Sequence, residues 1–141
     1  MNKNELFTIV VIAIILVLSI GSLYLFINKR TYELNLPKLE NLESILIKQN
    51  LNEKIITDNE KMKEVLDILV KERRITKEES IQDYPININD EIKIDFNFIE
   101  RGTSTIFLYT KNSKYYIEQP YNGIYQIDKE EYNYIEKLIK I

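Results

Sequence analysis

The sequence contains no histidine, cysteine or tryptophan, and only three glycines, three prolines and two methionines among its 141 residues. Without His or Cys the chain cannot use Ser-His-Asp or Cys-His catalysis, and it cannot bind zinc through thiolate or imidazole groups. Disulfides and a lipid anchor on cysteine are excluded for the same reason. Carboxylate pairs remain for acid–base or hydrolytic chemistry, but the acidic clusters have structural explanations, given below. We therefore expect no catalytic residue, no cofactor and no metal site.

Positive charge is also scarce. The chain has 19 Lys and Arg against 22 Asp and Glu, which gives a net charge of −3 at pH 7. Nucleic-acid-binding domains gather Lys and Arg into a patch or stripe, and this sequence contains no such cluster. We therefore expect no nucleic-acid partner.

The longest segment without a charged residue is 6–27, LFTIVVIAIILVLSIGSLYLFI. A helix of this length spans about 33 Å, enough to cross a hydrocarbon core about 30 Å thick. Tyr24 and Phe26 lie where an aromatic belt belongs, and charged residues follow them. The sequence predicts a single-pass transmembrane anchor at 6–27, preceded by a tail at 1–5 and followed by a linker at 28–38 and a folded domain at 39–141.

A cleavable signal peptide is the main alternative to an anchor. Ser19 and Gly21 are small residues at the two positions that a signal peptidase reads. The apolar run nevertheless continues through Leu23, Leu25 and Ile27, where a cleavage region would turn polar. The sequence therefore favours an uncleaved anchor.

Charge does not decide the orientation of this anchor. Lys3 and the terminal amine precede the span, while Lys29 and Arg30 follow it, so the positive-inside rule is nearly balanced. A short tail before a long C-terminal domain is typical of an N-terminus inside the cell. We therefore expect the domain to be extracytoplasmic.

Two later segments have the spacing of amphipathic helices. Apolar residues recur at 62, 65, 66 and 69, which predicts a helix over 59–74 capped by Thr57 or Asp58. Its last turn would hold Lys71, Arg73 and Arg74, favourably placed for the helix dipole. A second helix is predicted after Asp128, with apolar residues at 132, 135 and 139 on one face.

Alternating apolar and polar residues predict strands in the second half of the domain, at 91–98, 105–110, 114–119 and 124–127. Pro120–Gly123 is a turn in which Asn-Gly tolerates positive φ. Residues 39–57 fit either a helix or a hairpin turning at 49–52, and we favour the hairpin. The predicted class is α+β: an N-terminal transmembrane helix, then an antiparallel sheet of four to six strands with two packed helices.

The acidic clusters are explained by local structure. Asp128, Glu130 and Glu131 suit the start of a helix, where they satisfy backbone amides. The Asp and Asn residues between 83 and 90 lack the spacing of an EF-hand calcium loop, so we expect a solvated loop. Glu118 is unusual because it lies inside a strand. It is either an exposed residue paired with Arg101 or a lysine, or a recognition group in a partner site.

Tyrosines concentrate in the last third of the chain. In a regular meander, Phe107, Tyr109, Tyr116 and Glu118 share one face of the sheet, opposite Ile106, Leu108 and Ile117. These residues are either covered by a helix or form an aromatic binding platform, since Tyr is enriched at interfaces. The candidate partner-binding residues are Phe107, Tyr109, Tyr116, Glu118 and Tyr121.

The segment 115–125, YYIEQPYNGIY, follows a Thr-Ile-Phe-Leu-Tyr strand. This combination resembles an uncharacterised domain-of-unknown-function family of small anchored or secreted envelope proteins from clostridia and related Gram-positive bacteria. The resemblance covers 36–139 and is most specific at the Pro-Tyr-Asn-Gly turn. It implies a single domain behind a signal or membrane anchor, but it carries no activity and no catalytic residue.

We therefore expect a membrane-tethered extracytoplasmic domain of the bacterial cell envelope that binds a protein or peptide and is not an enzyme. One alternative is a self-immunity protein that sequesters an antimicrobial peptide or toxin, because net negative charge attracts cationic peptides. A carboxylate-based enzyme is the least favoured alternative. The sequence does not identify the ligand, the biological process or the oligomeric state.

Overall fold

The computed structural model describes residues 2–28, 30–71 and 73–140, which belong to two compact units, 1–31 and 32–141. The first unit is the helix α1, Lys3–Ile27, in which no side chain is buried. The helix begins at Lys3, before the predicted span, so most of the predicted tail is helical. Its first turn is capped by a hydrogen bond from the backbone N–H of Asn2 to Glu5 Oε2 at 2.9 Å. Its length and composition suffice to cross a membrane, and a signal sequence has the same two properties.

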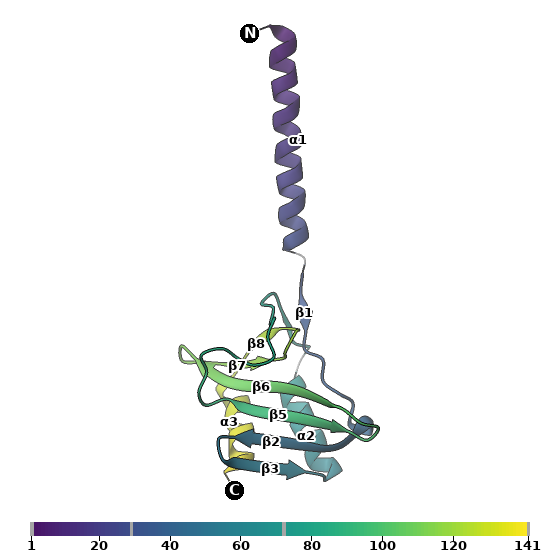
Figure 1. The fold of residues 1–141 in the computed structure, drawn as a ribbon, viewed down its shortest axis with the longest axis vertical. Helices are drawn as coiled ribbons and strands as arrows, with labels where there is room; N and C mark the ends of the chain where they lie inside the picture. Colours follow the sequence, from purple (N-terminus) through teal and green to yellow (C-terminus); the bar gives the residue numbers. More distant parts are fainter. Residues whose placement is uncertain (1, 29, 72, 141) are drawn as a thin grey trace. The chain divides into compact units, whose positions relative to one another are not determined.

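The second unit is built on a six-stranded antiparallel sheet with the order β3-β2-β5-β6-β7-β8 (Figure 1). This confirms the predicted α+β class. In chain order the strands are β2 (Leu42–Gln49), β3 (Asn52–Ile56), β5 (Ile92–Phe98), β6 (Thr103–Lys111), β7 (Lys114–Glu118) and β8 (Ile124–Ile127). From β5 onward each strand pairs with the next along the chain, as alternation predicted.

The ambiguous segment 39–57 contains the predicted hairpin. A single 3₁₀ turn, η1 (Leu39–Asn41), leads into β2, and β2 pairs with β3 up to Gln49 and Asn52. Asn50 has φ 53°, the left-handed conformation that Asn tolerates better than most residues. The helical alternative for this segment is therefore wrong beyond its first turn.

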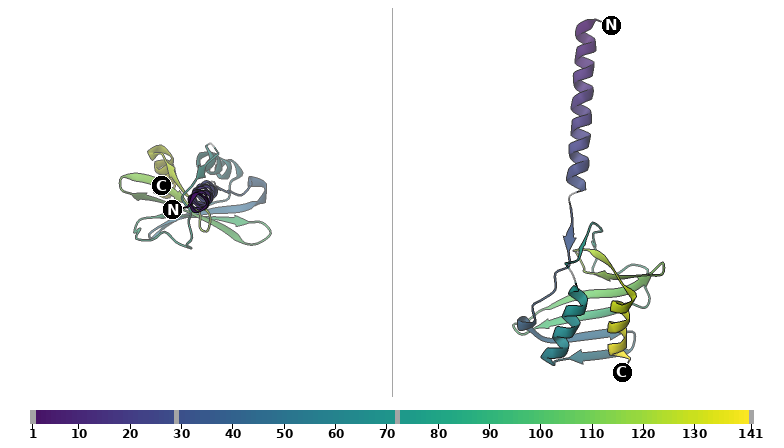
Figure 2. Two further views of the ribbon diagram at one scale, coloured as in Figure 1. Left: turned by 90° about the horizontal axis from the view of Figure 1, so that it is seen from above. Right: turned by 180° about the vertical axis from the view of Figure 1, so that it is seen from behind.

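Two helices, α2 (Asn59–Val70) and α3 (Lys129–Ile139), cover one face of the sheet (Figure 2). The core lies between them and the strands. Its fully buried members include Ile45, Ile47, Met62, Leu69, Ile92, Ile94, Phe96, Ile106, Leu108, Ile117 and Ile135. The apolar positions predicted for both helices, and the alternating positions of β5 up to Phe96, are thus confirmed as core.

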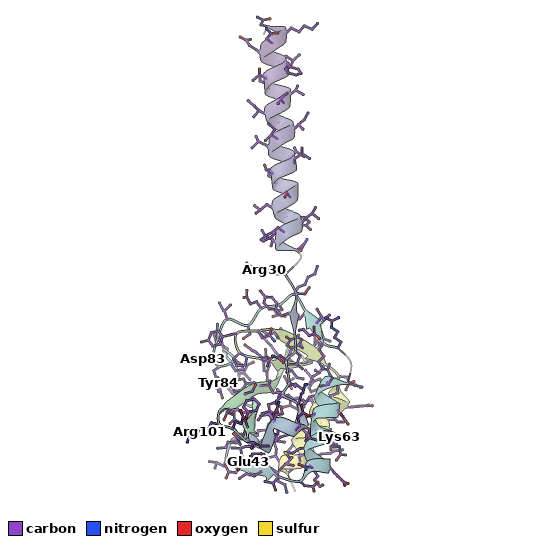
Figure 3. The ribbon with its side chains drawn as sticks, turned by 90° about the vertical axis from the view of Figure 1, so that its right-hand side faces the viewer. Arg30, Glu43, Lys63, Asp83, Tyr84 and Arg101 are labelled. Carbon is purple, nitrogen blue, oxygen red and sulfur yellow. The ribbon has the colours of Figure 1, made fainter. Side chains whose placement is uncertain are left out.

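The opposite face of the sheet is partly covered by chain that is neither helix nor regular strand. This cover is the segment 77–91, between β4 (Ile75–Thr76) and β5, which we call the strap. Figure 3 shows Asp83 and Tyr84 of the strap on one side of the sheet and Lys63 of α2 on the other. The domain therefore has helices on one face and a strap on part of the other.

The predicted linker at 28–38 belongs largely to the domain. β1 (Tyr32–Glu33) pairs with β4, and Leu34 and Leu36 pack against the core. The compact unit accordingly begins at Tyr32 rather than at residue 39. The reason is the apolar Leu34 and Leu36, which find a buried surface despite the polar residues around them.

Helix α2 is shorter than predicted, because it ends at Val70 and Lys71 takes a φ of 27°. Its N-cap is Asp58, whose Oδ1 accepts from Lys61 N at 2.9 Å, and not Thr57. Arg74 lies beyond the helix, yet its Nε donates to the carbonyl of Leu69 at 2.7 Å. The cation thus satisfies a C-terminal carbonyl from outside the helix, which the predicted range of 59–74 did not allow.

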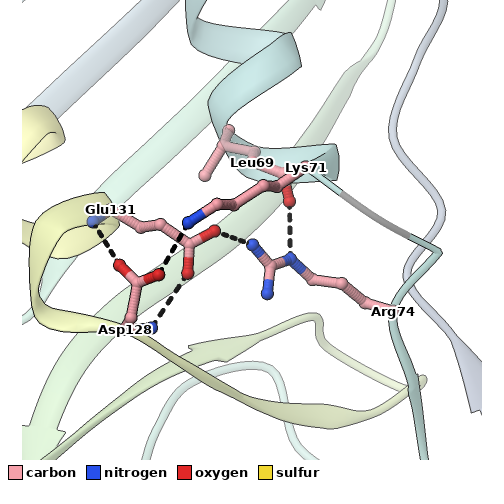
Figure 4. A network of polar contacts seen from close by, with 5 residues as sticks. All are labelled: Leu69, Lys71, Arg74, Asp128 and Glu131. Atoms are coloured by element: carbon pink, nitrogen blue, oxygen red, sulfur yellow. Dashed lines mark hydrogen bonds and ion pairs between the residues drawn. The ribbon is translucent and has the colours of Figure 1, made fainter.

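A polar network joins the C-terminus of α2 to the N-terminus of α3 (Figure 4). Asp128 and Glu131 form the predicted capping box, with Glu131 N 2.8 Å from Asp128 Oδ1 and Asp128 N 2.9 Å from Glu131 Oε2. Arg74 also donates to Glu131, and Lys71 Nζ lies 2.7 Å from Asp128 Oδ2. The hydrogen bond from Lys71 lowers the pKa of Asp128. The capping residues therefore also tie the two helices together.

Candidate functional site

Strand register places four of the five candidate partner-binding residues on one face, as predicted. Phe107 pairs with Glu118, and Tyr109 pairs with Tyr116. Phe107, Tyr109 and Glu118 are, however, only 2%, 4% and 5% exposed. The prediction of an exposed aromatic platform is therefore wrong for these three residues.

The cover over these residues is the strap and not a helix. The ring of Tyr84 meets that of Phe107 edge-on, with centroids 4.8 Å apart. Ser80 is also buried, and its backbone N–H donates to the carbonyl of Asn122 at 3.1 Å. The strap thus docks on β6, β7 and the Pro120–Gly123 turn, and excludes water from this part of the sheet.

Glu118 lies at the centre of the buried contacts. Ser80 Oγ donates to its Oε1 at 2.7 Å, and the Tyr109 hydroxyl donates to its Oε2 at 2.9 Å. The prediction of an exposed Glu118 is wrong, since its side chain is buried and, among the residues that the structure describes, is bound by Ser80 and Tyr109 rather than by Arg101 or a lysine. Its burial also leaves little of the carboxylate open to a partner. Burial is the main cause that raises the pKa of Tyr109, and the negative charge of Glu118 adds to it. The hydroxyl of Tyr109 therefore keeps its proton and remains a donor. Glu118 holds the strap in place.

The other two candidate residues reach solvent. Tyr116 is half-buried and stacks on Tyr109 with ring centroids 5.7 Å apart, while Tyr121 is 67% exposed. A hydrogen bond to Asp83 raises the pKa of Tyr121. Since their three companions are buried, the five candidates do not form one exposed surface.

The Pro120–Gly123 turn has a structural role. Asn122 N donates to the Gln119 carbonyl at 3.0 Å and Tyr121 has φ 56°, so the positive φ that we placed at Asn-Gly lies one residue earlier. Gln119 exchanges two hydrogen bonds with the backbone of Asn35. Gly123 is needed for close approach, because a Cβ there would lie 2.7 Å from Thr76 Cγ2. The side-chain amide of Asn122 also donates to the carbonyl of Glu33 at 2.7 Å, so the turn joins β1, the strap and the sheet.

A separate cleft of about 720 Å³ opens at the end of the sheet where β2 turns into β3 and β6 into β7. Four segments meet there: the β2–β3 turn, the end of the strap, the β6–β7 hairpin and α3. Of the thirteen described residues that line it, ten are polar, and six of these are Asn or Gln: Gln49, Asn50, Asn52, Asn87, Asn89 and Asn133. We call it the amide cleft.

The amide cleft has little net charge. Lys140 is the one cation among the described residues that line the cleft, and Lys140 Nζ lies 2.9 Å from Glu136 Oε2 in an i,i+4 pair. Asp90 accepts from Gln49 and Asn50 at 3.2 and 3.4 Å, through its carbonyl and its carboxylate respectively. Burial is the main cause that raises the pKa of Tyr132, and the negative charge of Glu136 adds to it. The tyrosine therefore stays neutral. The cleft can therefore offer hydrogen bonds more readily than charge.

The amide cleft is not recognisable from the sequence. Asn87, Asn89 and Asp90 are in the expected solvated loop, and only the folded chain brings them to α3 and the β2–β3 turn. The signal available was a set of asparagines in two separate connections. Within the described residues, no three His, Cys, Asp or Glu side chains are grouped as a metal site.

Comparison with known proteins adds a family without an activity. A family model, DUF5301, described as "Domain of unknown function (DUF5300)", matches residues 30–126. No curated protein and no solved structure matches the chain. The resemblance to an uncharacterised family is thus confirmed, with limits of 30–126 in place of 36–139. The match includes the whole strap and ends before α3 begins.

Proposed function

The chain belongs to the DUF5301 family, a domain of unknown function, and we propose that it is a membrane-tethered, non-catalytic domain that binds its ligand in the amide cleft. In this proposal α1 stays uncleaved and the domain lies outside the cell, in the envelope of a Gram-positive bacterium. The apolar run of α1 supports the tether, because it continues beyond the small residues at which a signal peptidase would cut.

The observation that carries the proposal is the amide cleft itself. Ligand sites are concave and place a few polar groups around an apolar or aromatic surface. Here Tyr115 and Tyr132 line the cleft, with ring centroids 5.0 Å apart, and amides surround them. A depression with this lining is suited to holding a small polar ligand or part of a larger one.

The chemistry of the lining supports binding rather than catalysis. Hydrolysis by carboxylates needs one group to act as acid and another as base or nucleophile. Two carboxylates, Asp90 and Glu136, stand among the lining residues that the structure describes, but Glu136 is paired with Lys140. Asp90 alone would have to perform both tasks, so we propose no reaction.

Site-directed photo-crosslinking in cells tests this proposal. A photoreactive amino acid replaces Asn89 on one side of the cleft or Asn133 on the other, and a control replaces Gln126, which is exposed on β8 outside the cleft. We expect a defined adduct from positions 89 and 133 and none from position 126. Equal labelling at all three positions, or none at 89 and 133, would contradict ligand binding in the cleft.

A further inference from the structure

We propose that the amide cleft binds a neutral, hydroxyl-rich ligand, namely a saccharide. This inference rests on the proposed function and names the ligand class for the same site. It follows from three properties of the lining: unengaged amides, a neutralised cation and a small aromatic surface.

Three of the amides, on three different walls of the cleft, are free to bind. A carboxamide has two N–H donors and one acceptor oxygen, and a sugar hydroxyl both donates and accepts. Asn52, Asn89 and Asn133 make no side-chain hydrogen bond with any residue that the structure describes, and two of them are exposed while Asn133 is half-buried. Three walls of the cleft, from β3, the strap and α3, therefore each offer an unengaged amide.

The charges argue against an anionic ligand. Phosphate and carboxylate ligands are usually held by Arg, Lys or helix N-termini. The lining residues include one cation, Lys140, and Glu136 is 2.9 Å from its ammonium group. Asp90 adds a negative charge close to Asn50. A phosphorylated or acidic group would therefore be repelled rather than bound.

The aromatic surface favours a sugar over a peptide. Protein and peptide partners are held mainly by apolar and aromatic anchors in deep pockets. Beside the tyrosines, Ile88 is the one apolar residue among the lining residues described. Tyr115 is half-buried and can support the C–H face of a sugar ring, while neighbouring amides bind its hydroxyls. Tyr132 is only 7% exposed and backs the ring of Tyr115 from the core side. The peptide partner expected from the sequence is less well matched to this cleft.

Binding is tested on the full chain in lipid nanodiscs prepared without sugar-based detergents. The probes are N-acetylglucosamine, its tetramer and a glucose tetramer, titrated by calorimetry with NMR shifts as a second readout. We expect saturable binding of at least one probe with shifts at cleft residues. Preference for a tetramer indicates a polymeric glycan, and equal binding of the monomer indicates a free sugar. No saturable binding by any probe would overturn the inference.

Matched variants locate the binding. Asn89→Ala with Asn133→Ala should weaken the affinity about tenfold, because each substitution removes a hydrogen-bonding amide. Asn41→Ala with Gln126→Ala removes two exposed amides outside the cleft and should leave the affinity unchanged. Equal affinities for both double variants would overturn the inference.

A lysine-rich cationic peptide separates failure of this inference from failure of the proposed function. Saturable peptide binding that the cleft variants weaken, together with no sugar binding, would overturn the saccharide and retain the binding domain. Absence of both, together with no adduct in cells from positions 89 and 133, would overturn both proposals.

Discussion

At the scale of single residues, Glu118 organises the polar contacts beneath the strap. Its two carboxylate oxygens accept hydrogen bonds from Ser80 and Tyr109, and all three residues are buried. A buried polar group is stable when it is paired and costly when its partner is removed. The attachment of the strap to the sheet therefore depends on this one side chain.

Glu118→Ala should lower the free energy of unfolding by about 2–4 kcal/mol, because it leaves two buried hydroxyls without an acceptor. Glu118→Gln keeps one acceptor oxygen and should cost less. Urea denaturation of the full chain measures both. Glu100→Ala, at an exposed carboxylate, serves as the control with little change expected. If Glu118→Ala lost no more stability than this control, the assigned role of Glu118 would be wrong.

Tyr125 presents the opposite case, because its buried hydroxyl has no hydrogen-bond partner among the residues that the structure describes. Tyr125→Phe should leave the stability unchanged or raise it by about 1 kcal/mol, since it removes an unpaired polar atom. Tyr109→Phe should lower it by about 1.5–3 kcal/mol, since it removes a hydrogen bond to a carboxylate. Thermal denaturation of the two variants measures their stabilities. If Tyr125→Phe were less stable than Tyr109→Phe, the hydrogen bonding assigned to these two hydroxyls would be wrong.

Tyrosines whose pKa is raised in the folded protein predict a loss of stability at alkaline pH. Burial raises the pKa of Tyr109, Tyr125 and Tyr134 from 10.0, to about 12 for the last two. A raised pKa means that the folded protein holds these protons more tightly than the unfolded chain does. The stability from this source is complete below pH 10.0 and is lost as pH rises toward 12. Urea denaturation between these pH values should show the decline, and Tyr125→Phe should reduce it. A free energy of unfolding that does not change over this pH range would refute the prediction.

At the scale of elements, periodicity and capping predicted the regular structure well. The alternation of β5 and the Asp128–Glu131 capping box both appear as expected, because each depends on neighbours in sequence. The path of the strap could not be predicted, since it has no period and depends on pairing with Asn122 and Gly123 far along the chain. Register thus placed Tyr109 and Glu118 on the correct face, but their burial depended on a non-local contact.

The amide cleft was beyond sequence analysis for the same physical reason. Its walls come from four segments, and none of them alone has a distinctive pattern. Tyr132 could be assigned to the buried face of α3, but its proximity to Asn89 and Asn50 follows only from the packing of α3 behind the sheet. A site made by tertiary assembly of common residues leaves no local motif.

The polar network between the C-terminus of α2 and the N-terminus of α3 gives a prediction about the packing of these helices. Glu131→Ala removes both its capping bond and the partner of Arg74, and both side chains are largely buried. We expect a loss of about 2–4 kcal/mol in the free energy of unfolding. Glu130→Ala, in the same first turn but exposed, is the control with a loss below about 0.5 kcal/mol. Similar losses for both variants would show that the network contributes little.

At the scale of the whole molecule, the chain combines a helix with the length and composition of a membrane span and a domain whose cleft is lined by amides. The domain extends from Tyr32 to the C-terminal helix, and its core, strap and turn are mutually dependent. The proposed function requires that this domain stay attached to α1 and face the outside of the cell.

Two measurements on the same cells test this requirement most directly. They are the protease accessibility of a C-terminal tag and the size of the protein in the membrane fraction. We expect a full-length chain in the membrane whose tag is cleaved on intact cells, after removal of the wall where necessary. A tag protected until lysis would place the domain in the cytoplasm, and a shortened chain released from the membrane would show that α1 is a signal peptide. Either result would contradict a tethered domain that presents its cleft outside the cell.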